Sequence, residues 1–159
     1  MRPNSISRTM AGLLLILALC AVPAISHAYD MTGAGGKLGV TSPENLEQTV
    51  MIGGHLEFEK SDTRLHLMPN VMYWNVDHVS DFQPNMDVYY HFNRGNQVSP
   101  YLGGGLGLNV RTDDTSLGAN LIGGVRFPSH SNCYFLEGRF TASDQDQVAV
   151  LGGVTFKTH

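Results

Sequence analysis

The stretch Leu117–Phe127, LGANLIGGVRF, holds the clearest regular pattern in this chain of 159 residues. Its odd-numbered positions are apolar or glycine, while its even-numbered positions place Asn120 and Arg126 among glycines and one isoleucine. Successive side chains of a β-strand point to opposite faces, so a period of two predicts a strand with one apolar and one polar face. No helical period competes with this alternation after residue 28.

The same alternation returns in seven further segments. It is plain in Val50–Phe58, where His55 and Glu57 share the polar face, and in Val148–Phe156 near the end of the chain. Pro69 falls inside one segment and removes a backbone donor, which predicts a β-bulge there. The eight strands that we predict cover residues 35–42, 48–59, 63–76, 82–93, 98–111, 115–128, 132–143 and 147–157.

The polar faces of these strands carry charged side chains and histidines. Charges enclosed in a dry core cost much free energy. A membrane barrel turns its apolar face to lipid and its polar face to the lumen. The sequence therefore predicts an all-β fold, an eight-stranded antiparallel up-and-down transmembrane β-barrel. The residues expected in its lumen charge network are Glu57, Arg64, His66, Asp87, His91, Arg126, Glu137 and Arg139, and Arg111 shares the polar face of its strand.

Eight strands enclose only enough space for side chains, so we expect a filled lumen. Opposite charges should then pair inside it. The nearest partners across the predicted hairpins are Glu57 with Arg64, and Arg126 with Glu137. The alternative is a narrow ion path along the same groups.

Aromatic side chains end the apolar faces of several strands at one predicted rim. Aromatic rings favour the boundary between membrane and water. An even number of strands places both termini at this rim, which is periplasmic in bacterial barrels. Tyr73, Phe82 and Phe140 are candidates for a thinner belt at the opposite rim. The membrane-interface aromatics predicted for the terminal rim are Phe58, Tyr90, Phe92, Phe127, Tyr134 and Phe156.

The beginning of the chain predicts a secretory signal. Arg2 and Arg8 precede an apolar run, Ala11–Val22, and small residues lead to a cleavage site after Ala28. The alternative, an uncleaved anchor helix, needs roughly 20 apolar residues. We therefore expect a signal peptide over residues 1–28 and one outer-membrane barrel domain over residues 29–159.

The signal and three of the strand segments resemble a known family. With the signal, Tyr101–Gly107, Ala119–Phe127 and Leu151–Phe156 are similar to small outer-membrane β-barrels of the outer-membrane protein A transmembrane-domain type. The resemblance implies insertion into a Gram-negative outer membrane by the barrel-assembly machinery. We also expect contact with outer-membrane lipid and lipopolysaccharide, and a monomer. Such barrels usually end on an aromatic residue, whereas Phe156 is followed by three more residues.

Composition and motifs limit the function. Without Arg2 and Arg8, 8 of the 10 basic residues remain against 14 acidic ones, a net charge of −6 that argues against a nucleic-acid partner. The turn Ser129–Asn132 resembles a lipid A deacylase motif, but its His and Ser are adjacent. We expect a non-enzymatic protein with a structural or interaction role in the envelope. The alternatives are a soluble, lipocalin-like periplasmic barrel for an apolar ligand, a lipid A-modifying enzyme and a narrow pore.

We predict no cofactor and no metal. The histidines match no zinc spacing, and Cys133 is the only cysteine left after cleavage. Gly33–Leu38 is not a phosphate loop, because Leu38 replaces the required Ser or Thr, and we expect it to be a flexible lead-in. The turns opposite the termini are acidic, and two alternatives stay open for them: solvated loop tips, or Ca²⁺ or Mg²⁺ bridges to lipopolysaccharide. Their carboxylates are Glu44, Glu47, Asp77, Asp81, Asp113, Asp114, Asp144 and Asp146.

Overall fold

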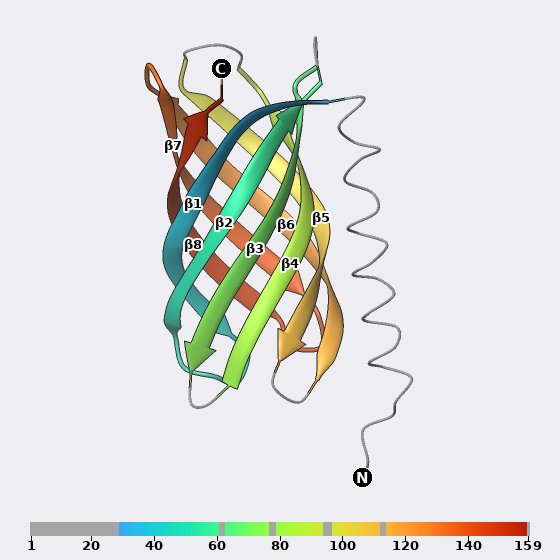
Figure 1. The fold of residues 1–159 in the computed structure, drawn as a ribbon. Helices are drawn as coiled ribbons and strands as arrows, with labels where there is room; N and C mark the ends of the chain where they lie inside the picture. Colours follow the sequence, from blue (N-terminus) through green and yellow to red (C-terminus); the bar gives the residue numbers. More distant parts are fainter. Residues whose placement is uncertain (1–28, 61–62, 77–78, 94–96, 112–113, 159) are drawn as a thin grey trace.

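Eight antiparallel strands close into a barrel in chain order (Figure 1). Each strand pairs with the next, and β1 pairs with β8 to close the sheet, which confirms the predicted fold. The computed structural model describes residues 29–60, 63–76, 79–93, 97–111 and 114–158, so the predicted signal peptide lies outside the described residues. The strands are β1 (Asp30–Pro43), β2 (Thr49–Glu59), β3 (Leu65–Val76), β4 (Val79–His91), β5 (Ser99–Arg111), β6 (Thr115–Pro128), β7 (Asn132–Ala142) and β8 (Gln147–Lys157).

The first strand is longer than the sequence predicted. Strand β1 pairs with both β2 and β8 through the segment Gly33–Leu38, so the expectation of a flexible lead-in there was wrong. Glycines hide the alternation of this segment because they have no side chain to show which face they occupy. The parity is nevertheless kept: Lys37 is buried in the lumen and Leu38 is exposed outside.

Pro69 causes no bulge. Strand β3 keeps a continuous register with β4, in which Pro69 lies opposite Met86. On the other side, the pairing with β2 stops after His55 opposite Asn70 and resumes in the same register at Phe58 opposite Leu67. The missing proline N–H interrupts the ladder without shifting it.

The two faces of the sheet divide as the alternation predicted. Outward-facing leucines are the most exposed apolar side chains, with Leu121 at 65% relative exposure, whereas Glu137 in the lumen is at 1%. Glycines on the inner face make room for rings: a Cβ on Gly124 would collide with Tyr101, and one on Gly153 with Phe135. Among the described residues, no helix is long and apolar enough to span a membrane.

Candidate functional site

Four ionised side chains meet in the middle of the lumen. Lys37 Nζ lies 3.1 and 3.2 Å from the two carboxylate oxygens of Glu137. Arg139 Nη2 lies 2.6 Å from Asp87 Oδ2 and 3.3 Å from Glu137 Oε1. We call Lys37, Asp87, Glu137 and Arg139 the central cluster. Its two positive and two negative charges sum to zero, and all four residues are buried.

Neutral donors complete the coordination of the cluster's carboxylates. The hydroxyls of Tyr89 and Tyr101 donate to Glu137 Oε2 at 3.2 and 3.1 Å. The amides of Asn70 and Asn120 donate to Asp87 at 2.7 and 3.0 Å. Buried charges are tolerated when they are paired and hydrogen-bonded in this way. The centre of the barrel is therefore filled by one connected polar network.

An apolar cluster lies nearer the rim opposite the termini. Met51, Met72, Trp74, Ala149 and Leu151 pack together there from β2, β3 and β8, with every member nearly inaccessible to solvent. These apolar side chains fill one side of the lumen, and they neither bind water nor coordinate ions.

The adjacent strands β4 and β5 carry an ion pair at the same end, where Asp81 lies opposite Trp74 in the sheet. Arg111 Nε donates to Asp81 Oδ2 at 2.8 Å. The sequence had placed Asp81 among the exposed acidic turns, which was wrong, because this carboxylate is fully buried. Asp81 is the third residue of β4, and its side chain points inward.

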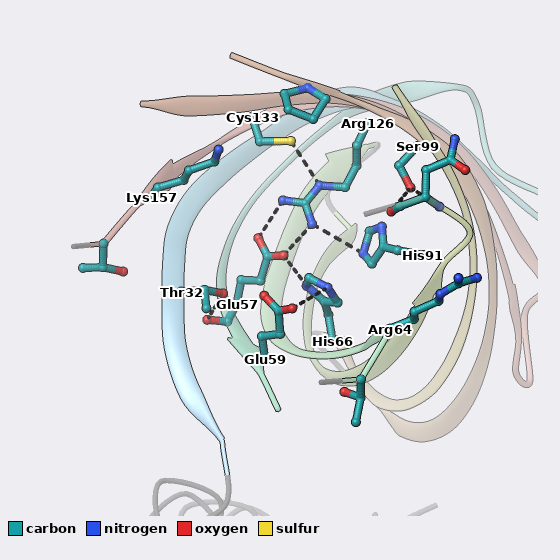
Figure 2. Close-up of a pocket in the computed structure, with 14 residues that line it drawn as sticks. Thr32, Glu57, Glu59, Arg64, His66, His91, Ser99, Arg126, Cys133 and Lys157 are labelled. Carbon is teal, nitrogen blue, oxygen red and sulfur yellow. Dashed lines mark hydrogen bonds and ion pairs between the residues drawn. The ribbon is translucent and has the colours of Figure 1, made fainter. Parts of the chain in front are cut away.

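At the terminal rim the lumen opens into a cavity of about 570 Å³ (Figure 2). Arg126 organises it: its Nη2 lies 3.0 Å from Glu57 Oε2, and its Nε donates to Cys133 Sγ at 3.0 Å. His66 Nδ1 lies 2.6 Å from Glu57 Oε1, and His91 Nε2 lies 3.4 Å from Arg126 Nη1. We call this cavity the terminal vestibule, defined by Glu57, His66, His91, Arg126 and Cys133.

The predicted pairing of the lumen charges was wrong in both cases. Glu57 pairs with Arg126, and Glu137 pairs with Lys37 and Arg139. The narrow bore lets a long side chain cross from β6 to β2, so a partner need not come from the adjacent hairpin. Arg64 forms no ion pair among the described residues: it is exposed at the mouth of the vestibule, where it donates to the Phe92 carbonyl at 3.2 Å.

The other lumen candidates face inward. His66, Asp87, His91, Arg126, Glu137 and Arg139 all point into the barrel, divided between the vestibule and the central cluster. Sequence reasoning placed Lys37 in the predicted strand 35–42 but left it out of the lumen network, because the glycines around it hide which face each position occupies. The signal that would have found it is parity: Lys37 lies between Gly36 and Leu38, on the opposite face from the exposed Leu38.

The predicted interface aromatics lie at the terminal rim. Phe127 is opposite Tyr134 across the β6–β7 hairpin, and Tyr90 meets Phe92 edge to face at 5.4 Å. Phe156 is 56% exposed, and Phe58 is partly buried beside Leu67. At the far rim, Tyr73 is opposite Phe82, while Phe140 is opposite Val148.

The serines and histidine of the deacylase-like turn do not assemble into a catalytic group. Ser129 N donates to the Asn132 carbonyl at 2.8 Å, which closes a tight turn between β6 and β7. Among the described residues, no hydrogen bond joins His130 to either neighbouring serine. A serine nucleophile needs a base within hydrogen-bond reach and a third group that orients the base.

Some carboxylates of the turns opposite the termini accept hydrogen bonds from backbone N–H groups of the same turn. Asp146 Oδ1 accepts from Ser143 N at 3.2 Å, and Asp114 Oδ1 accepts from Thr115 N at 2.8 Å. Glu44, Glu47 and Asp144 are exposed, and Asp77 and Asp113 lie outside the described residues.

Two solved structures have a similar architecture. Neisserial surface protein A (NspA) superimposes with a TM-score of 0.65 at 14% identity, over 80% of this chain and 96% of NspA. The outer membrane enzyme PagL gives a TM-score of 0.54 at 14% identity, over 76% of this chain and 97% of PagL. The chain has the fold of a small outer-membrane β-barrel. No family model and no curated protein matches it.

The outer-membrane barrel fold is common to proteins that differ in activity. PagL is an enzyme by description, and NspA is described as a surface protein. Function must therefore be argued from the side chains of this chain and not from its fold.

Proposed function

We propose that this protein is a non-enzymatic barrel of the outer membrane with a structural or interaction role in the cell envelope. The observation that carries the proposal is the orientation of the two faces. Large apolar side chains such as Leu121, Leu136 and Val150 are more than half exposed on the outside, while the ionised central cluster is sealed inside. Lipid is the solvent in which such a surface is stable.

This orientation disfavours the soluble, ligand-binding alternative. A lipocalin-like barrel lines its interior with apolar residues and turns charges to water. Here Lys37, Asp87, Glu137 and Arg139 fill the middle of the lumen with their hydrogen-bonding partners, and the apolar side chains at the far end pack against one another, so the described part of the lumen offers no apolar cavity for a ligand. An extended apolar exterior would also make a soluble protein aggregate.

The packing of the lumen disfavours the pore. The central cluster fills the middle of the barrel, and Met51, Met72 and Trp74 fill part of the far end. A conducting path needs a continuous line of water or exchangeable polar groups. The proposed role is therefore that of a closed barrel which displays its turns at the cell surface and its vestibule to the periplasm.

The proposal includes the partners that such a barrel meets. The apolar exterior contacts outer-membrane lipid and lipopolysaccharide, and the barrel-assembly machinery inserts the chain. The exposed aromatics of the terminal rim, such as Phe127 and Tyr134, serve as membrane-interface anchors. The barrel acts as a monomer, because β1 pairs with β8 and leaves no free sheet edge.

Cell fractionation combined with gel migration tests the proposal. We expect the chain in the outer-membrane fraction, released by detergent but not by salt or osmotic shock, with a faster-migrating folded band that disappears on boiling. Release by osmotic shock without detergent contradicts it. Lipid A profiles of a deletion strain test the enzymatic alternative, and an altered acyl pattern that the wild-type gene restores overturns the non-enzymatic assignment.

A further inference from the structure

We propose that Glu57, His66 and His91 form a binding site for a divalent transition metal ion, with Zn²⁺ as the best-matched ion. Each residue offers one ligand atom, and these atoms all lie within 4.8 Å of one another in the terminal vestibule (Figure 2). The site does not depend on the role proposed above, since any barrel with this lumen would have it.

The three side chains come from adjacent strands of a rigid wall. Glu57 is on β2, His66 on β3 and His91 on β4. The ring centroids of His66 and His91 are 4.2 Å apart. Ligands that project from neighbouring strands hold their relative positions better than ligands on loops. Zn²⁺ with bonds of about 2.0–2.1 Å needs these atoms only about 3.3–3.4 Å apart, which small side-chain rotations provide.

The ligand set selects the class of ion. Two imidazoles and one carboxylate suit Zn²⁺ and other nitrogen-seeking divalent ions, and they suit Ca²⁺ and Mg²⁺ poorly because those prefer oxygen. The ion would replace the proton held between His66 Nδ1 and Glu57 Oε1, which are 2.6 Å apart, and that proton would pass to solvent. The fourth ligand position faces the open vestibule and is available to water.

Arg126 opposes the ion in this site. Its Nη1 donates to Glu57 Oε1 and lies 3.4 Å from His91 Nε2, so it occupies the space between two ligands. The guanidinium must move its Nη1 away before a cation enters, while its 3.0 Å bond from Nη2 to Glu57 Oε2 can persist and orient the carboxylate. Removing the positive charge of Arg126 should therefore strengthen metal binding, an effect opposite to that of removing a ligand.

Zinc titration of the detergent-refolded barrel, without a histidine tag and against a chromophoric chelator, tests the site. We expect one Zn²⁺ per chain. H66Q and H91Q should weaken binding by more than about 100-fold, because loss of an outer partner alone costs roughly 10- to 100-fold. E57Q should weaken it by about tenfold or more, and R126Q should tighten it by about tenfold because a neighbouring cation is removed. His130 lies on the exposed β6–β7 turn at the same rim, so H130Q is the matched control and should leave the zinc affinity unchanged.

Gel migration before and after boiling shows whether each variant folds. If H66Q or H91Q does not fold, the test passes to Co²⁺ in the wild-type barrel, whose visible absorption should report tetrahedral nitrogen and oxygen ligands. Three results overturn the proposal: no saturable Zn²⁺ binding by the wild type, binding that survives H66Q and H91Q, or binding that H130Q abolishes. Weaker binding in R126Q overturns the assigned role of Arg126.

Discussion

Replacing Leu121 with arginine tests the orientation of the barrel's outer face. Leu121 lies at the middle of β6 and is 65% exposed, and Leu117, four residues nearer the far rim, is 62% exposed. Four residues advance a strand by about 13 Å, which at a tilt of about 40° is about 10 Å of depth. The apolar band of such a barrel is about 25 Å tall, so Leu121 lies near its middle and Leu117 near its edge.

The two substitutions should therefore differ although the side chains are almost equally exposed. Arginine at the midplane destabilises a membrane barrel by about 2–4 kcal/mol, and near the interface by about 0–1 kcal/mol. We expect L121R to lower the free energy of unfolding by about 2–3 kcal/mol more than L117R. In water both would be surface substitutions, worth within about 0.5 kcal/mol of zero.

Denaturant unfolding in phospholipid vesicles measures the difference. Trp74 is the only tryptophan in the chain and is buried in the lumen, so its fluorescence reports folding without lying near either substitution on the outer face. Equal unfolding midpoints for L121R and L117R would refute the reasoning, since no gradient of polarity would then surround the strand.

Three further predictions concern the inside of the barrel. Lys37→Met should lower the free energy of unfolding by about 3–5 kcal/mol, because it leaves the central cluster with a net negative charge. The double variant with Glu137→Gln should lose less than the sum of the two single variants. Urea unfolding measures these losses, and strict additivity would contradict the coupling of the two charges. Gly153→Ala should cost about 1–3 kcal/mol because its Cβ would strike the Phe135 ring, whereas the outward-facing Gly152→Ala should be nearly neutral, a contrast visible in the same assay. The refolded wild type should show no steady current in planar bilayers, and reproducible single-channel steps would contradict the filled lumen.

The sequence predicted the strands because the period of two is a local property. In β6 and β8 the alternation is strong enough to show both the strand and the face that points outward. It fails where glycine removes the side chains that reveal parity, as in Gly33–Leu38, and the start of β1 was missed for that reason. The predicted β-bulge at Pro69 was wrong, since one absent N–H interrupts a ladder of hydrogen bonds but does not shift the register.

The contacts inside the lumen depend on the stagger of the closed sheet, which no single strand encodes. Arg126 reaches Glu57 across the bore although 69 residues separate them, and Lys37 meets Glu137 at a separation of 100. The same holds for the proposed metal ligands. Glu57, His66 and His91 have no motif spacing, and they meet only because three adjacent strands place them at one height.

The central cluster and the terminal vestibule differ in solvent exposure, and this difference assigns them different roles. In the central cluster the side chains of Arg139 and Glu137 are 2% and 1% exposed, so separating their charges would leave ions in a dry interior at a cost of several kcal/mol. In the vestibule the side chain of Arg126 is 14% exposed, beside an open cavity into which its guanidinium can swing and remain hydrated. Of these two groups, only the vestibule can therefore rearrange at low cost. The central cluster fixes the closed barrel, and the proposed exchange of a proton for a metal ion belongs to the Glu57–Arg126 end of the lumen.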